Sequence, residues 1–162
     1  MANTNDELAA LSRFFKPQLL SNSTVLLQNW PEKPTKQTLV IRSLPDETSV
    51  IATGLTRTTR SFQVLYVDDR IDKALALVDK LKLELAGVIT IPVDAETFAF
   101  MRVNEILGGK PFKTEGSAPL DGASFTIRTT SHVARSSEVY ENMQQASISF
   151  SQLKGLFFVA QN

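Results

Sequence analysis

The chain has 162 residues, a length typical of one domain. Its 17 basic and 17 acidic residues leave a formal net charge of zero, which argues against a protein whose main task is to grip nucleic acid. Cysteine is absent, which excludes disulfides, thiol catalysis and Cys-based zinc sites. No apolar run approaches the roughly 20 residues of a membrane helix, and acidic residues stand where a signal peptide would be basic. We therefore expect a soluble protein made in the cytoplasm.

The N-terminal part of the chain predicts a helix followed by several strands. Leu8, Leu11 and Phe15 share one face at helical spacing, Thr4 can cap this helix, and Pro17 stops it. Composition and alternation then predict strands at residues 24–30, 38–44, 49–53 and 61–67. Short polar turns between the last three strands favour an antiparallel meander.

The clearest helical pattern spans residues 69–86. At about 100° per residue its apolar side chains fall within one arc and its charged side chains lie opposite. Asp68 or Asp69 is the expected N-cap, and Gly87 is placed to end the helix. Leu83 falls on the polar side, where it is either an ordinary exposed leucine or a contact between subunits.

The C-terminal part of the chain is rich in strand patterns. Strands are predicted at 88–93 and 97–106, and four glycines and two prolines predict a projecting loop over 107–122. Further strands are predicted from about residue 122 onward, at 124–133, 147–153 and 156–160. The order predicts a single α+β domain over residues 1–162, with helices packed on a mostly antiparallel sheet.

Tests for catalytic motifs give negative results. His132 is the only histidine, and no Gly-x-Ser-x-Gly motif is present to supply a nucleophile. Gly108-Gly109-Lys110 resembles part of a phosphate loop, but Asn104 and Pro111 occupy positions where that motif needs glycine and a hydroxyl residue. The sequence therefore predicts no enzymatic activity and no cofactor.

Two groups of charged residues allow more than one interpretation. Asp68, Asp69 and Asp72 could hold a divalent cation, or they supply the acids that favour a helix start; we favour the second and predict no metal site. The basic residues form either a solvated surface, or salt bridges across a subunit interface or toward a duct that carries DNA.

Three segments in this order resemble the tail terminator proteins of long-tailed bacteriophages, several of which are described as minor capsid or head–tail joining proteins. An amphipathic N-terminal helix precedes a strand with the sequence LLQNWP (residues 26–31) and then TLVIR (residues 38–42). The closest local match is RSFQVLY (residues 60–66), which runs directly into the helix at 69–86. The resemblance covers roughly residues 5–105.

This resemblance implies a structural role in a virus particle. Proteins of this family form hexameric rings that cap the finished tail tube, stop its polymerisation and present a surface to the head connector. The implied location is the virion, at the neck of the tail. The implied partners are further copies of the chain, the tail tube protein and the head–tail connector protein, with DNA only as passing cargo and no membrane.

The candidate contacts between subunits or rings come from the polar loops, the off-pattern leucine and the glycine-containing loop. They are Asp46, Glu47, Arg57, Arg60, Leu83, Lys110 and Lys113. Two alternatives stay open. One is another ring of the same particle, such as the head-side stopper or the tail tube protein, of which a tube protein would polymerise into long tubes. The other is a small non-viral ligand-binding α+β domain, which a pocket with converging polar groups would support.

Overall fold

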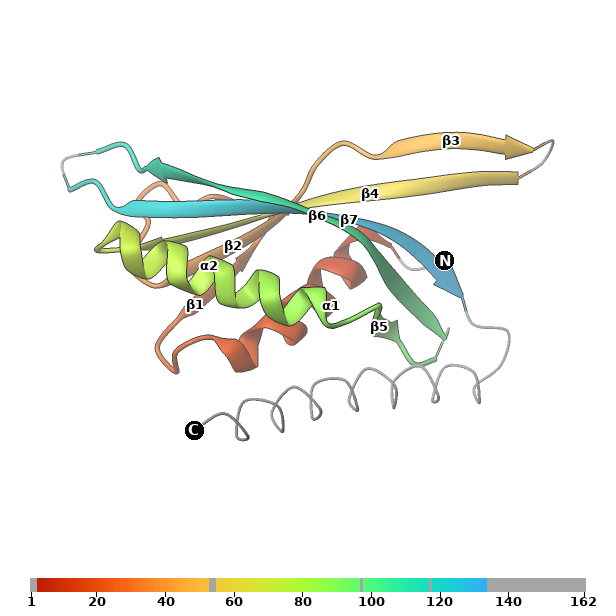
Figure 1. Ribbon diagram of the computed structural model, residues 1–162, viewed down its shortest axis with the longest axis horizontal. Coiled ribbons are helices and arrows are strands. Elements are labelled where there is room, and N and C mark those ends of the chain that lie inside the picture. The colour runs from red at the N-terminus through yellow and green to blue at the C-terminus, as the bar shows by residue number, and fades with distance from the viewer. Residues whose placement is uncertain (1–2, 53–54, 97, 117, 134–162) are drawn as a thin grey trace.

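The computed structural model describes residues 3–52, 55–96, 98–116 and 118–133. The fold is a single α+β domain in which the helices pack on one face of a curled, mixed sheet (Figure 1). The elements, in chain order, are α1 (Thr4–Phe15), the 3-10 helix η1 (Lys16–Gln18), β1 (Thr24–Leu27), β2 (Thr38–Ser43), β3 (Glu47–Ala52), β4 (Leu55–Asp68), α2 (Ile71–Ala86), β5 (Thr90–Asp94), β6 (Ala99–Lys113) and β7 (Asp121–Val133).

The sheet follows the order β1-β2-β4-β7-β6-β5, and β3 pairs with β4 outside this path. The β1–β2 pair is parallel and the other pairs are antiparallel. The expected meander is wrong at one step, because β2 and β3 both pair with β4 and not with each other. Strand β4 is 14 residues long, so its first part can pair with β3 and its second part with β2.

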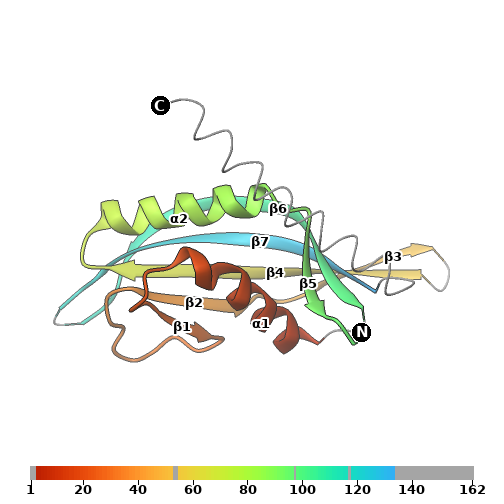
Figure 2. The ribbon, with the colours of Figure 1, turned by 90° about the horizontal axis from the view of Figure 1, so that it is seen from below.

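The long hairpin of β3 and β4 overhangs the rest of the sheet. Residues 55–58 of β4 pair only with β3 within the described part of the chain, whereas the pairing of β4 with β7 begins at Thr59. Figures 1 and 2 show this ribbon projecting beyond one end of the molecule. We call β3 together with residues 55–58 the arm.

The N-cap of helix α1 lies one residue earlier than expected. Asn3, rather than Thr4, is the N-cap, and it forms a capping box with Asp6. The Asp6 backbone N–H donates to the Asn3 side chain at 2.9 Å, and the Asn3 N–H donates to the Asp6 carboxylate at 3.1 Å. The helix ends at Phe15, and Pro17 lies in the following 3-10 turn.

Helix α2 confirms the predicted apolar arc but not the predicted cap. Its buried residues are Ala74, Val78, Leu81 and Leu85. Arg70 occupies the N-cap position and makes no capping hydrogen bond through its side chain, so the assignment of Asp68 or Asp69 as cap is wrong. The backbone of Gly87 closes the C-terminus, as expected.

The core lies between the two helices and the concave face of the sheet. Helix α2 contacts β4, β6 and β7, whereas α1 contacts β2 near one edge of the sheet and β5 at the other. Figure 2 shows how the curl brings both edges toward the helices. Aromatic packing joins the layers, since the rings of Phe15 and Phe125 meet edge to face with 6.2 Å between their centroids.

The expected loop over residues 107–122 is instead mainly the end of a β-hairpin. Strand β6 continues to Lys113, β7 begins at Asp121, and Gly108 and Gly109 lie within β6. The glycines and prolines of this segment predicted a loop. Pro111 is nevertheless part of a strand, at a position where β6 has β7 as its one described neighbour. An edge strand tolerates a proline because one side of its backbone needs no ladder partner.

None of the helices within the described residues has the length and apolar character needed to cross a membrane. The strands expected at residues 147–153 and 156–160 lie outside the described residues.

Candidate functional site

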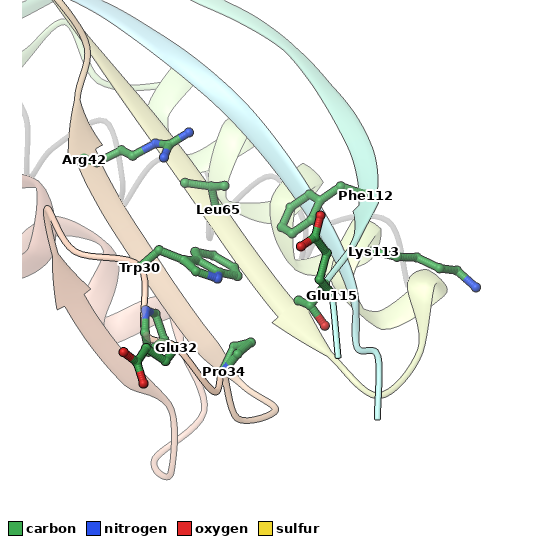
Figure 3. Close-up of a pocket in the computed structure, with 10 residues that line it drawn as sticks. Trp30, Glu32, Pro34, Arg42, Leu65, Phe112, Lys113 and Glu115 are labelled. Atoms are coloured by element: carbon green, nitrogen blue, oxygen red, sulfur yellow. The ribbon is translucent and has the colours of Figure 1, made fainter. Parts of the chain in front are cut away.

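The face of the sheet opposite the helices carries a groove of about 460 Å³. The connector between β1 and β2 forms one wall, the end of the β6–β7 hairpin forms the other, and β2 and β4 form the floor (Figure 3). We call this feature the aromatic groove. It is lined by Trp30, Pro31, Glu32, Pro34, Arg42, Leu65, Phe112, Lys113, Thr114 and Glu115.

Two aromatic rings from opposite walls meet across the groove. The rings of Trp30 and Phe112 lie edge to face, with 5.9 Å between their centroids and an interplanar angle of 68°. Such a pair contributes about 0.5–1.5 kcal/mol beyond the area that it buries. Phe112 faces Gly122 in the β6–β7 ladder, and a Cβ atom at Gly122 would lie 2.4 Å from the Phe112 ring. The ring therefore occupies space that only glycine leaves open.

The groove carries charges of both signs. The Nε and Nη2 groups of Arg42 donate to the Gln63 side-chain oxygen at 2.8 and 2.6 Å, so the described partner of this cation is neutral. Lys113 lies 3.7 Å from Asp121. Glu32 and Glu115 are exposed, and neither forms an ion pair with another described residue. The groove thus offers an apolar centre with unmatched charge at its rim.

A second polar feature, the Glu7 cluster, lies where the arm joins the body. It consists of Glu7 on α1, Arg60 on β4, Asp46 before β3, and Ser131 on β7. Arg60 Nη1 donates to Glu7 Oε1 at 2.5 Å, and Arg60 Nε lies 3.3 Å from Asp46 Oδ2. The Ser131 hydroxyl donates to the same Glu7 oxygen. Arg60, at the base of the arm on β4, therefore ties the first helix to the residue that precedes β3.

Glu7 is fully buried, with 0% of its side chain exposed, and its Oε2 atom has no described hydrogen-bond partner. Burial raises the pKa of this carboxyl group above its ordinary value, and the hydrogen bond from Ser131 and the charge of Arg60 oppose the shift only in part. In the sequence, Glu7 is only one of the acidic residues near the N-terminus. Its burial was missed because the pairing residues lie 53 and 124 positions away.

The structure brings together only some of the candidate contact residues. Asp46 and Arg60 pair within one chain, and Lys113 lies at the aromatic groove. Leu83 is 55% exposed on α2, as its off-pattern position predicts. The remaining positions are on strands: Glu47 opposite Thr59, Arg57 opposite Ser49, and Lys110 opposite Ser124.

The three carboxylates near the start of α2 each contact a different partner. The buried Asp68 accepts a hydrogen bond from the Tyr66 hydroxyl at 3.0 Å, Asp69 pairs with Lys73, and Asp72 pairs with Arg70. Burial and the neighbouring Asp68 raise the pKa of Tyr66, and the hydrogen bond from Lys73 lowers the pKa of Asp69. Within the described ranges, no three potential metal-ligating side chains gather at one point.

No model of a known protein family matches the sequence, and no curated protein matches it significantly.

The aromatic groove is not predicted by the sequence patterns described above. Trp30 was assigned to a strand, and Phe112 to a loop, so nothing placed the two rings together. A usable signal was present, because Trp30 stands beside Pro31 and close to Pro34. Prolines hold the chain extended and lower the entropy cost of holding a tryptophan at a surface.

Proposed function

We propose that this chain is a structural virion protein of the tail terminator type. In this proposal, copies of the chain form a ring, most simply a hexamer, at the neck of a bacteriophage tail. The ring caps the tail tube, stops its polymerisation and meets the head–tail connector protein, while DNA passes through. The chain acts through its surfaces and carries out no catalysis.

The observation that supports the proposal most is the arm. An isolated two-stranded ribbon is marginally stable in water, yet residues 55–58 extend past every described strand except β3. The Glu7 cluster fixes the base of this ribbon to the body. Among the described residues this projection has no further strand or helix to pack on beyond its own two strands, so it is suited to a surface on another subunit. In the proposed ring the arm meets a different patch on its neighbour, which makes a heterologous contact of the kind a ring requires.

The oligomeric state of the purified full-length protein tests the proposal. Light scattering across a concentration series, with electron microscopy of the same samples, is expected to reveal monomers that convert to single closed rings. Long tubes formed by this protein alone would favour its assignment as a tail tube protein over its assignment as a terminator. A monomer at every concentration, also when tail tubes are present, would contradict a ring-forming role.

The aromatic groove favours a second candidate, the small ligand-binding domain. Its volume of about 460 Å³ lies within the range of small-molecule sites. This alternative predicts that a small molecule changes the fluorescence of Trp30 and raises the melting temperature of the monomer. A screen that gives both changes with one compound would favour it over the structural role.

A further inference from the structure

The arm and the aromatic groove lie along one strand, at its opposite ends. Residues 55–58 begin β4 within the arm, and Leu65, near the end of the same strand, lies in the groove. Figure 3 shows the two walls flanking β4, with Trp30 and Pro34 on one side and Phe112 on the other. The groove therefore lies over β4, between its two walls.

We propose that the aromatic groove is the docking site for the arm of a second copy of this chain. This inference rests on the ring proposed above and names the two surfaces that meet in it. Copies placed head to tail along the direction of β4 bring the projecting ribbon of one subunit to the groove of the next. Each subunit then gives one arm and receives another, and this head-to-tail contact forms a ring when the rotation between neighbouring subunits closes.

The chemistry of the two surfaces is complementary. The arm carries the apolar residues Val50, Ile51 and Leu55 in its sequence, and the groove offers the rings of Trp30 and Phe112. Burying large apolar side chains against such rings removes apolar surface from water and so stabilises an interface.

The charges are also complementary in sign. Arg57 is the one basic residue in the sequence of the arm, and the groove rim has Glu32 and Glu115, which form no ion pair within the described ranges. Glu47 is the one acidic residue of the arm, and Arg42 of the groove has only a neutral described partner. A contact of these surfaces can therefore match charges in both directions, which favours one register over others.

Trp30 is the only tryptophan of the chain, so its fluorescence reports on the groove alone. As the concentration of the full-length protein rises, the emission of Trp30 is expected to shift to shorter wavelength and its quenching by acrylamide to fall. Ile51→Lys, in the arm, is expected to abolish this shift. Leu20→Lys, which changes an apolar residue that is 57% exposed elsewhere, is expected to keep it. An equal shift in the wild type and in Ile51→Lys would overturn the proposal.

The absence of cysteine allows a direct test by cross-linking. Thr56→Cys protein, with the thiol on the arm, is mixed with Glu115→Cys protein, with the thiol at the groove, and oxidised. We expect a disulfide-linked dimer of the two proteins. Asp72→Cys, at an exposed position at the start of α2, is the matched control and is expected to give little product. Equal cross-linking of Thr56→Cys to Asp72→Cys and to Glu115→Cys would contradict the docking site.

The two proposals can fail separately. Closed rings in electron micrographs, without the cross-link between positions 56 and 115 and without a Trp30 shift, would overturn the docking site and leave the ring-forming function in place. The specific cross-link together with a Trp30 shift, in a protein that never caps tail tubes, would support the docking site and overturn the terminator function.

Discussion

At the scale of single residues, Glu7 makes the most consequential contacts. Its carboxyl group is buried, takes one hydrogen bond from Arg60 and one from Ser131, and has one oxygen without a described partner. A buried ion pair is weak support for stability, because desolvation offsets the attraction between the charges, whereas loss of one partner costs about 3–5 kcal/mol. The cluster therefore fixes the position of the arm more than it stabilises the domain.

The raised pKa of Glu7 predicts a pH dependence with a definite sign. Because the folded protein holds a proton on Glu7 more readily than the unfolded chain does, the stability from this proton is complete below about pH 4.5. It is lost as the pH rises through the raised pKa. The melting temperature of the wild type relative to that of Glu7→Gln is therefore expected to fall as the pH rises above about 4.5.

Glu105→Gln controls for the general loss of one negative charge, because Glu105 is half exposed and pairs with Arg128 at the surface. Thermal unfolding followed by circular dichroism provides the measurement. A wild type that gains stability over Glu7→Gln as the pH rises would show that Arg60 and Ser131 outweigh burial.

Gly122 gives a second prediction at this scale. A methyl group there would lie 2.4 Å from the ring of Phe112, so Gly122→Ala must displace the ring from Trp30. We expect a loss of about 1–3 kcal/mol in the free energy of unfolding and a change in Trp30 fluorescence. Gly108→Ala, where a Cβ would meet nothing within 4 Å, is expected to change neither quantity. Equal effects at the two glycines would contradict the packing of Phe112 described above.

At the scale of elements, sequence patterns predict those features that residues close together in the chain determine. The arc of α2 is buried as predicted because a helix that covers a sheet must turn one continuous apolar stripe toward it. The pairing of β2 with β4 instead of β3 was not predictable in this way, because strand alternation says which face is buried but not which neighbour is paired. The same limit hid the aromatic groove and the Glu7 cluster, whose members come from distant segments.

The orientation of α2 can be tested by a pair of substitutions. Val78 is fully buried and Ala76 is exposed on the same helix. Val78→Asp puts an unpaired charge into the core at a cost of several kcal/mol, which is comparable with the whole stability of a small domain. Val78→Asp is therefore expected to prevent cooperative folding. The free energy of unfolding of Ala76→Asp is expected to stay within about 0.5 kcal/mol of that of the wild type. A normal thermal transition in Val78→Asp would mean that the helix faces the other way.

At the scale of the whole molecule, the two helices cover one face of the sheet and leave the other face with the aromatic groove. The arm extends from one end of the molecule (Figure 1), and the aromatic groove includes Leu65, which lies toward the opposite end of β4. A subunit with different features at its two ends can make the head-to-tail contacts from which a ring is built. Assembly, rather than chemistry within one chain, is the role that this arrangement favours.

The length of growing tail tubes in the presence of this protein tests the central claim most directly. Tail tube protein is allowed to polymerise with and without the full-length chain, and the tubes are measured by electron microscopy. The account predicts shorter tubes, each ended by a single ring of this protein, and no further growth when more tube protein is added. Tubes that keep their length and grow from bare ends, or that incorporate this protein along their walls, would contradict it.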